Sequence, residues 1–282
     1  MRTRVETLTL EASGFTFDAV AAGPAGGRVV LLLHGFPQTS RSWTAVAGRL
    51  AEAGHRAVAP DLRGYSPGAR PQRVEDYASA ALAGDVVGFA DALGAERVDV
   101  VGHDWGAAVA WQAAARAPDR IRSLTAVSVP HPHAFAHALR TDPDQQERSA
   151  YIGLFRQAGK AEHVLSRDDW RALRAMYQGM VPAEDVEHYV RVLAADGALT
   201  AALNYYRAAS REDLKGLGEI RAPTLYVWST GDVAVGRAAA EATAQHVAAP
   251  YRFVELEGVT HWIPDEAPAE LATAIIDHLG GS

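Results

Sequence analysis

The chain has 282 residues, enough for one large α/β domain or two smaller ones that bury a stable core. Hydrophobic residues make up 48% and charged residues 22% of the sequence, a balance typical of folded globular proteins rather than disordered or fibrous ones. A formal net charge of -7 disfavours nucleic acid and anionic lipid surfaces as partners, and the lack of cysteine excludes disulfides and thiolate chemistry.

Two segments bear on the location of the protein. Residues 1–10 contain two arginines but no apolar stretch of the kind that a signal peptide needs. The longest aliphatic run, Val29–Leu33, is far shorter than the roughly 20 residues that span a bilayer. We therefore expect a cytoplasmic protein in which this run forms a buried strand.

The amino-terminal part predicts a β-hairpin followed by alternating strands and helices. Between residues 5 and 21, apolar and polar residues alternate around Ser13-Gly14, the pattern of a half-buried hairpin. Val29–Leu33 is apolar on both faces, as in a central strand of a parallel sheet that helices cover on both sides. Further expected elements are helices at 40–53, 76–93 and 105–115, and strands at 56–59, 98–101 and 124–129.

This alternation stops between residues 130 and 213, where Trp170, Leu173, Met176 and Tyr177 have helical spacing and strand signals are missing. It resumes with strands at 224–228 and 251–256 and helices at 237–247 and 267–279. The sequence therefore predicts the α/β class: a mostly parallel central sheet with an N-terminal hairpin and an inserted helical cap. The expected division is a core domain made of residues 1–129 and 214–282, interrupted by a cap made of residues 130–213.

A strand, a sharp turn and a helix of small residues follow one another in residues 98–108. The segment Gly102-His103-Asp104-Trp105-Gly106 has the spacing of a nucleophile elbow, whose glycines allow a strained turn to lift the central side chain above the sheet. Serine is the usual central residue, and Asp104 takes its place here. Because purely structural turns also use this spacing, a catalytic interpretation needs further parts of a site.

The segment His34-Gly35-Phe36-Pro37 directly follows the most apolar strand. With this turn and the Asp104 motif, the chain resembles the epoxide hydrolase branch of the α/β-hydrolase fold family over residues 29–279. The resemblance implies that the backbone amides of Phe36 and Trp105 form an oxyanion hole. Two such preorganised donors stabilise a developing negative charge by several kcal/mol. The alternative for the His-Gly-Phe-Pro segment is an ordinary tight turn.

A histidine and an acid complete the expected triad. His261 follows the last strand, where α/β-hydrolases place the catalytic base after the nucleophile and the acid. Asp232, directly past the strand at 224–228, is the acid we expect. Asp265 is nearer to His261 in sequence, but four residues along a loop need not bring it to the imidazole. Some relatives carry the acid after the preceding strand, but residues 124–133 contain no carboxylate.

The exchange of serine for aspartate changes the expected chemistry. A carboxylate with a reference pKa of about 3.9 is ionised at neutral pH and can attack without a base. Attack on a carbonyl would give a reactive mixed anhydride, whereas attack on a saturated carbon gives an ordinary ester. Epoxides and alkyl halides are therefore the expected substrates, and His261 remains free to activate water for hydrolysis of the ester.

The leaving group separates these two substrate classes. An epoxide leaves as a strongly basic alkoxide and needs a proton, which a tyrosine can supply. Tyr151 and Tyr206 lie in segments that resemble the cap segments carrying the paired tyrosines of epoxide hydrolases, with Tyr205 as the alternative donor. A haloalkane or haloacid dehalogenase stays the second hypothesis, because the indole of Trp105 could bind a halide. Against it, Phe36 stands where haloalkane dehalogenases usually have a polar residue, and Trp105 where fluoroacetate-type dehalogenases have arginine.

Two further groups of polar residues, three histidines and a pair of aspartates, are expected to have structural roles only. We expect His131, His133 and His137 to lie in a solvated loop, since their spacing matches no metal motif, and Asp168-Asp169 to open a helix. The expected reaction needs no cofactor and no metal. The expected partners are a small, mostly apolar epoxide and water, and a homodimer is left open. A third hypothesis is a ligand-binding member of the fold with little or no turnover.

Overall fold

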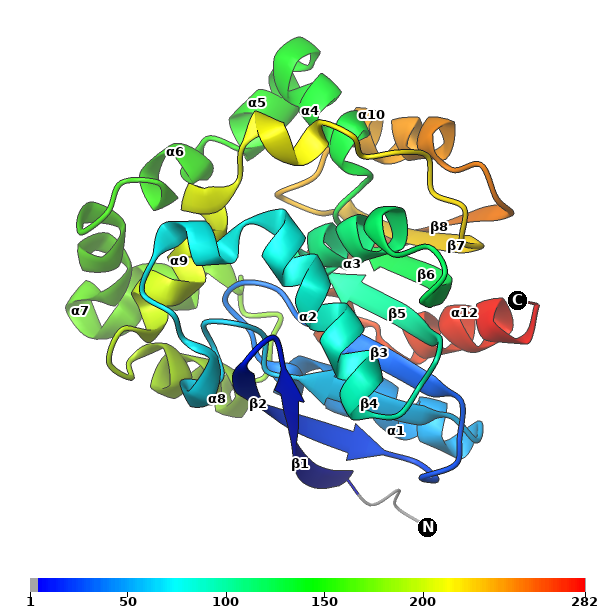
Figure 1. Cartoon of the computed structure of the whole chain (residues 1–282). Coiled ribbons are helices and arrows are strands. Elements are labelled where there is room, and N and C mark those ends of the chain that lie inside the picture. Colours follow the sequence, from blue (N-terminus) through cyan, green and yellow to red (C-terminus); the bar gives the residue numbers. More distant parts are fainter. Residues whose placement is uncertain (1–4, 282) are drawn as a thin grey trace.

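The computed structural model describes residues 5–281, so residues 1–4 of the segment considered for a signal peptide lie outside the described residues. Within the described range, eight strands form one sheet in the order β1-β2-β4-β3-β5-β6-β7-β8 (Figure 1). β2 is antiparallel to β1 and β4, and the other neighbours are parallel, which confirms the predicted sheet. The strands are β1 (Val5–Ala12), β2 (Phe15–Ala22), β3 (Val29–Leu33), β4 (Arg56–Pro60), β5 (Val98–His103), β6 (Ile121–Val127), β7 (Thr224–Gly231) and β8 (Tyr251–Thr260).

The hairpin turn follows from its two central residues. Ser13 and Gly14 have φ angles of 52° and 79° and join Ala12 to Phe15 as directly paired residues. Two consecutive residues with positive φ are typical of the tight turn whose twist matches that of the flanking strands.

Helices cover both faces of the sheet and form one apolar core on each side. Along β3, Leu31 and Leu33 pack into one core and Val30 and Leu32 into the other, because successive side chains of a strand point to opposite faces. The first core includes α2 (Ser79–Ala92) and α3 (Trp105–Arg116), and the second includes α1 (Thr44–Glu52) and α12 (Pro268–Gly280). Burial on both faces explains why β3 reads as an uninterrupted aliphatic run.

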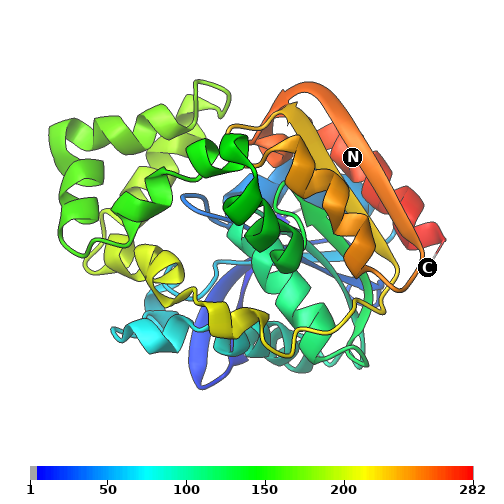
Figure 2. The same cartoon turned by 90° about the horizontal axis from the view of Figure 1, so that it is seen from above.

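A set of helices, here called the helical insertion, lies between β6 and β7 in the chain. Figure 2 shows that its middle part lies on the far side of the molecule from α12 (red). The insertion contacts the loops that follow strands: the hydroxyl of Tyr177 donates to Pro37 O at 2.8 Å, and Trp262 Nε1 donates to Met176 O at 3.1 Å. Its helices are α4 (Pro132–Thr141), α5 (Pro143–Arg148), α6 (Tyr151–Phe155), α7 (Lys160–Met176), α8 (Ala183–Leu193) and α9 (Ala198–Ala208).

Of the residues noted for their helical spacing, Leu173, Met176 and Tyr177 fall on the second helical stretch of α7 and the residue after it, whereas Trp170 lies in the kink before that stretch. Leu173 and Tyr177 are buried, as this spacing predicts. Asp168 and Asp169, which we expected to open a helix, lie in a kink inside α7, directly before its second helical stretch. Both have positive φ angles, of 53° and 54°.

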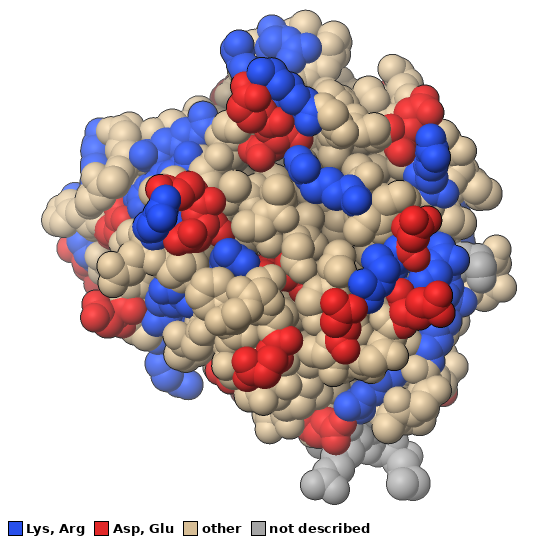
Figure 3. All heavy atoms as spheres, viewed as in Figure 1, with Lys and Arg blue, Asp and Glu red and all other residues tan. Residues whose placement is uncertain are grey.

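The remaining described segments connect these elements. The carboxyl-terminal part adds α10 (Arg237–Ala242) and the short α11 (Ile263–Glu266). Short 3-10 helices occur at Ser40–Trp43, Pro67–Ala69, Val74–Tyr77, Arg211–Leu214 and Thr243–His246. No helix within residues 5–281 is long and apolar enough to cross a membrane. Acidic and basic side chains lie interspersed over the face in Figure 3.

Candidate active site

Asp104 lies in the sharp turn between β5 and α3. Its φ and ψ angles are 52° and -120°, a conformation that costs a non-glycine residue on the order of 1–3 kcal/mol. The flanking glycines are required sterically: a Cβ at Gly102 would collide with the backbone of Gly106, and one at Gly106 would collide with Leu33 O. The turn therefore holds the Asp104 carboxylate above the sheet, in a site where the residue is only 7% exposed.

The His-Gly-Phe-Pro turn lies against this carboxylate. The Phe36 amide donates to Asp104 Oδ1 at 2.8 Å. His34 Nε2 accepts from Leu62 N at 3.0 Å, which leaves Nδ1 to donate to Gly35 O at 3.0 Å and fixes the turn to the segment after β4. Trp105 is the first residue of α3, so its amide is one of the free donors at that helix N-terminus.

His261 lies between two carboxylates. Its Nδ1 is 3.0 and 3.1 Å from the two carboxylate oxygens of Asp232, and its Nε2 is 3.6 Å from Asp104 Oδ2. Asp265, the alternative acid, instead accepts from Gln38 Nε2 at 2.7 Å. The geometry thus brings Asp104, His261 and Asp232 together in the order that the sequence suggested.

The pKa values of His261 and Asp232 are shifted in opposite directions. Burial disfavours a charged imidazole, but Asp232 and Asp104 outweigh it and raise the pKa of His261 to about 10. Burial also opposes ionisation of Asp232, but His261 and the amides of Ala234 and Val235 outweigh it and lower the pKa of that carboxyl. The Asp232 carboxylate is therefore the permanent negative charge that orients the imidazole.

The two cap tyrosines face the same region. Tyr151 in α6 and Tyr206 in α9 have ring centroids 6.2 Å apart, and the ring of Tyr206 packs edge-on against those of Phe36 and Trp105. Burial raises the pKa of both phenols, so both keep their protons at neutral pH. The neighbouring Tyr205 points elsewhere, because its hydroxyl donates to Arg63 O at 2.8 Å.

One histidine beside the nucleophile was not singled out in the sequence. His103 is fully buried, its Nε2 donates to His261 O at 2.8 Å, and burial lowers its pKa to about 4. His103 is therefore neutral, and its hydrogen bond holds the backbone at His261 in place. Its position next to Asp104 in the motif was the available signal.

The solvated-loop interpretation is wrong: His131 is buried, and His133 and His137 lie in the helix α4. The His131 side chain is 1% exposed, and its ring stacks on that of His246 at 4.6 Å between centroids. His133 is half-buried beside it and His137 is exposed. His131 is buried because its ring packs against those of Trp111 and His246, and its Nδ1 caps α4 by accepting from His133 N. Among residues 5–281, no three His, Asp or Glu side chains are grouped as metal ligands.

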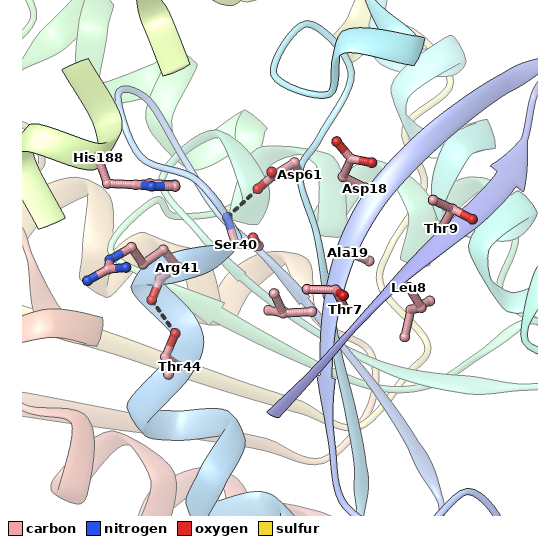
Figure 4. A pocket seen from close by; sticks show the side chains of 11 residues that line it. Thr7, Leu8, Thr9, Asp18, Ala19, Ser40, Arg41, Thr44, Asp61 and His188 are labelled. Carbon is pink, nitrogen blue, oxygen red and sulfur yellow. Dashed lines mark hydrogen bonds between the residues drawn. The ribbon is translucent and has the colours of Figure 1, made fainter. Parts of the chain in front are cut away.

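A separate hollow lies outside this group, with a volume of about 640 Å³. Figure 4 shows the residues that line it, which come from the hairpin, from the segments after β3 and β4, and from α8. Asp61 accepts from Ser40 N at 2.7 Å there. None of the residues expected to be catalytic lines this hollow.

Comparison with known proteins agrees with this geometry. The model of the alpha/beta hydrolase fold family matches residues 28–268. Epoxide hydrolase A of Mycobacterium tuberculosis is 33% identical, over 96% of this chain and 96% of that protein. The crystal structure of epoxide hydrolase A from Mycobacterium thermoresistibile superposes with a TM-score of 0.87 and 30% identity, covering 99% of each chain. That of an epoxide hydrolase from Bacillus megaterium, in complex with an inhibitor, has a TM-score of 0.88 and 26% identity, covering 97% of this chain and all of the other. The chain therefore belongs to the α/β-hydrolase fold family and, within it, to the epoxide hydrolases.

Proposed function

We propose that the protein converts an epoxide into a vicinal diol through a covalent ester on Asp104. One observation carries this mechanism: the two oxygens of the Asp104 carboxylate have different surroundings. Oδ1 accepts the Phe36 amide at 2.8 Å, whereas Oδ2 lies 3.6 Å from His261 Nε2, beyond hydrogen-bonding distance. Oδ2 is thus the oxygen available to attack, and Oδ1 becomes the carbonyl oxygen of the ester.

In the first step, Asp104 Oδ2 forms a bond to one epoxide carbon while the bond from that carbon to the ring oxygen breaks. Tyr151 and Tyr206 hold the ring oxygen by hydrogen bonds, and one of them transfers its proton to the developing alkoxide. The raised pKa values of both phenols keep these protons in place until the alkoxide, a stronger base, forms.

In the second step, His261 removes a proton from water, and the hydroxide attacks the Asp104 carbonyl carbon. The oxyanion forms on Oδ1, where the amides of Phe36 and Trp105 stabilise it. Collapse expels the alcohol oxygen of the product, which takes the proton from His261. The carboxyl group left on Asp104 then gives up its proton, and the tyrosinate left by the first step takes up a proton, so both groups return to their starting forms. Formation of the ester removes one of the two negative charges that raise the pKa of His261, so the imidazole loses its proton more readily in this step.

The surroundings of Asp104 support an epoxide with an apolar substituent. Phe36, Trp105 and Phe155 pack around Tyr206, so the phenols are the polar groups placed among aromatic rings. We place the cap at residues 130–213 and the core domain at residues 1–129 and 214–282. A cytoplasmic location and a homodimer stay predictions.

Replacement of His261 tests the mechanism. In His261→Gln the first step should proceed and the second should stop, so the intact-protein mass should rise by the mass of the epoxide. Asp104→Asn is the control and should form no adduct. A modest loss of turnover with no adduct on any reactive epoxide would contradict the role of His261.

A substrate panel tests the substrate class. Wild-type protein is incubated with epoxides, haloalkanes and esters, and the release of diol, halide and acid is measured. Diol release alone supports the proposal, halide release supports a dehalogenase, and binding without product supports a ligand-binding protein.

A further inference from the structure

The turn that carries Asp232 is held by a side chain of the helical insertion. Gln145 in α5 is fully buried, and both ends of its amide contact this turn. Nε2 donates to Ala234 O at 2.8 Å, and Oε1 accepts from Gly236 N at 2.8 Å. The amide thus matches one acceptor and one donor of the turn backbone, an arrangement that no carboxylate or aliphatic side chain reproduces at neutral pH.

A second side chain of α5 contacts the same turn. Arg148, one helical turn after Asp144, donates to the backbone carbonyl of Asp232. The turn also lies close to the helix, since a Cβ on Gly236 would lie 2.7 Å from Asp144 Oδ2. Figure 1 shows α4, the helix before α5, next to α10, the helix that follows this turn.

The same turn also holds the Asp232 carboxylate in place. Asp232 Oδ1 accepts from Ala234 N at 2.8 Å and from Val235 N at 3.0 Å, and the same carboxylate accepts from His261 Nδ1. A shift of residues 234–236 would therefore move the carboxylate away from the imidazole. The chain of contacts runs from Gln145 through the turn and Asp232 to His261 and does not include Asp104. Gln145 Nε2 also donates to Ser149 Oγ at 3.0 Å, a contact within the helical insertion that does not reach the hydroxyl of Tyr151 or Tyr206.

We propose that Gln145 is a positioning residue for the second half-reaction: it fixes the 232–236 turn so that Asp232 orients His261 toward the attacking water. The effect of Gln145 on the rate of ester hydrolysis rests on the proposed function, whereas its effect on the pKa of the His261 imidazole does not. Loss of Gln145 slows hydrolysis of the ester and leaves its formation nearly unchanged. A purely structural role would alter both steps through general loosening of the protein.

The chain offers a matched control in the next residue. Gln146 lies on the same helix but is exposed, and its Nε2 donates to Leu139 O within the insertion. The test variant is Gln145→Met, which keeps the length and volume of the side chain and removes its hydrogen bonds. The control variant is Gln146→Met.

Both half-reactions are measured by rapid quenching and intact-protein mass, with a reactive epoxide such as styrene oxide. In Gln145→Met, ester formation should stay within about 2-fold of wild type and ester hydrolysis should slow about 10- to 100-fold, because small misplacements of a catalytic group cost up to that much. Gln146→Met should match wild type in both steps. An unchanged hydrolysis rate, or equal slowing of both steps, overturns the proposal.

A measurement without substrate separates this inference from the proposed function. The pKa of His261 is read by NMR from its imidazole signals in free wild-type protein and in both variants. The groups that face this imidazole are Asp232, Asp104 and His103. Gln145→Met should lower the pKa of His261, since Asp232 is less well placed, and Gln146→Met should not. If Gln145→Met does not fold, Gln145→Leu takes its place, because it also removes the hydrogen bonds to Ala234 O and Gly236 N and adds no charge near His261; an unshifted pKa in the folded variant overturns the inference.

Discussion

Adjacent tyrosines on α9 have separate environments, and this separation can be tested by removing one hydroxyl at a time. Tyr206→Phe removes a proposed proton donor and should lower kcat/KM by about 100-fold, the usual contribution of general acid catalysis. Tyr205→Phe removes the hydrogen bond to Arg63 O and should lower the free energy of unfolding by about 1 kcal/mol with little change in rate. Steady-state kinetics and urea unfolding measure both. A larger loss of rate in Tyr205→Phe than in Tyr206→Phe would show that the donors are assigned the wrong way round.

Asp232 should set the pH dependence of ester hydrolysis. His261 must be neutral to take a proton from water, so the hydrolysis rate rises with pH through its pKa. Asp232 raises that pKa, and Asp232→Asn should therefore move the midpoint to lower pH. The plateau rate should also fall by about 100-fold or more, because the orienting carboxylate is lost. Single-turnover hydrolysis of the ester across a pH series measures both effects, and a midpoint that stays or rises would contradict this role.

The part of the site that is local in sequence could be predicted, and the part made by distant contacts could not. Asp104 and Phe36 each lie in a motif of five or fewer residues whose spacing encodes the turn. Tyr206 could be placed only by its resemblance to a family segment, since the phase of α9 separates it from Tyr205. Gln145 lies 91 positions before Gly236, the backbone it contacts, and no pattern in the sequence joins the two.

At the scale of single elements, boundaries were harder to predict than the elements themselves. β6 was expected at residues 124–129, but it runs from Ile121 to Val127. Its early start was hidden by polar residues: Ser123 is buried in the strand because its hydroxyl donates to Asp99 Oδ1 at 2.7 Å. Its early end follows from Ser128, whose φ of 66° turns the chain out of the sheet. The polar residues at the start of β6 therefore hid its true beginning, because the neighbouring strand β5 supplies a hydrogen-bond partner for Ser123.

Two helical glycines allow the packing of the elbow to be tested. Gly106 in α3 lies against the end of β3, and a Cβ there would collide with Leu33 O. Gly106→Ala should therefore destabilise the protein by roughly 3 kcal/mol, because α3 must move away from the sheet. Gly84 in α2 has open space around it, so Gly84→Ala should stabilise the protein by up to about 1 kcal/mol through helix propensity. Urea unfolding at neutral pH measures both, and a Gly106→Ala protein as stable as wild type would refute the close packing.

At the scale of the whole molecule, two apolar cores on opposite faces of one sheet hold the strand ends in place. Because the parallel strands end at the same edge, residues far apart in sequence, such as Phe36, Asp104 and Asp232, meet there. The helical insertion then closes this edge and leaves Asp104 and His261 almost wholly buried. The sequence predicted the sheet and the insertion, whereas the contacts between them depend on how the insertion packs.

Burial of neutral histidines should make the stability of the whole molecule fall in mild acid. Burial lowers the pKa of His103 to about 4 and that of His131 to about 3, below the ordinary value near 6.5. Between those values each of these two histidines binds a proton in the unfolded chain but not in the folded one. The stability that His103 and His131 contribute is therefore fully present above pH 6.5 and falls as the pH drops toward 4.

His131→Phe isolates one of these two contributions. The phenyl ring keeps the stacking on His246 but cannot bind a proton. The free energy of unfolding of His131→Phe should therefore fall less steeply with decreasing pH than that of wild type, by up to about 1.4 kcal/mol per pH unit, the value for one proton. Urea unfolding of both proteins at pH values between neutral and about 4.5 measures the slopes. Parallel curves would mean that His131 binds its proton equally well in the folded and unfolded states, and that its burial does not govern the acid sensitivity of the protein.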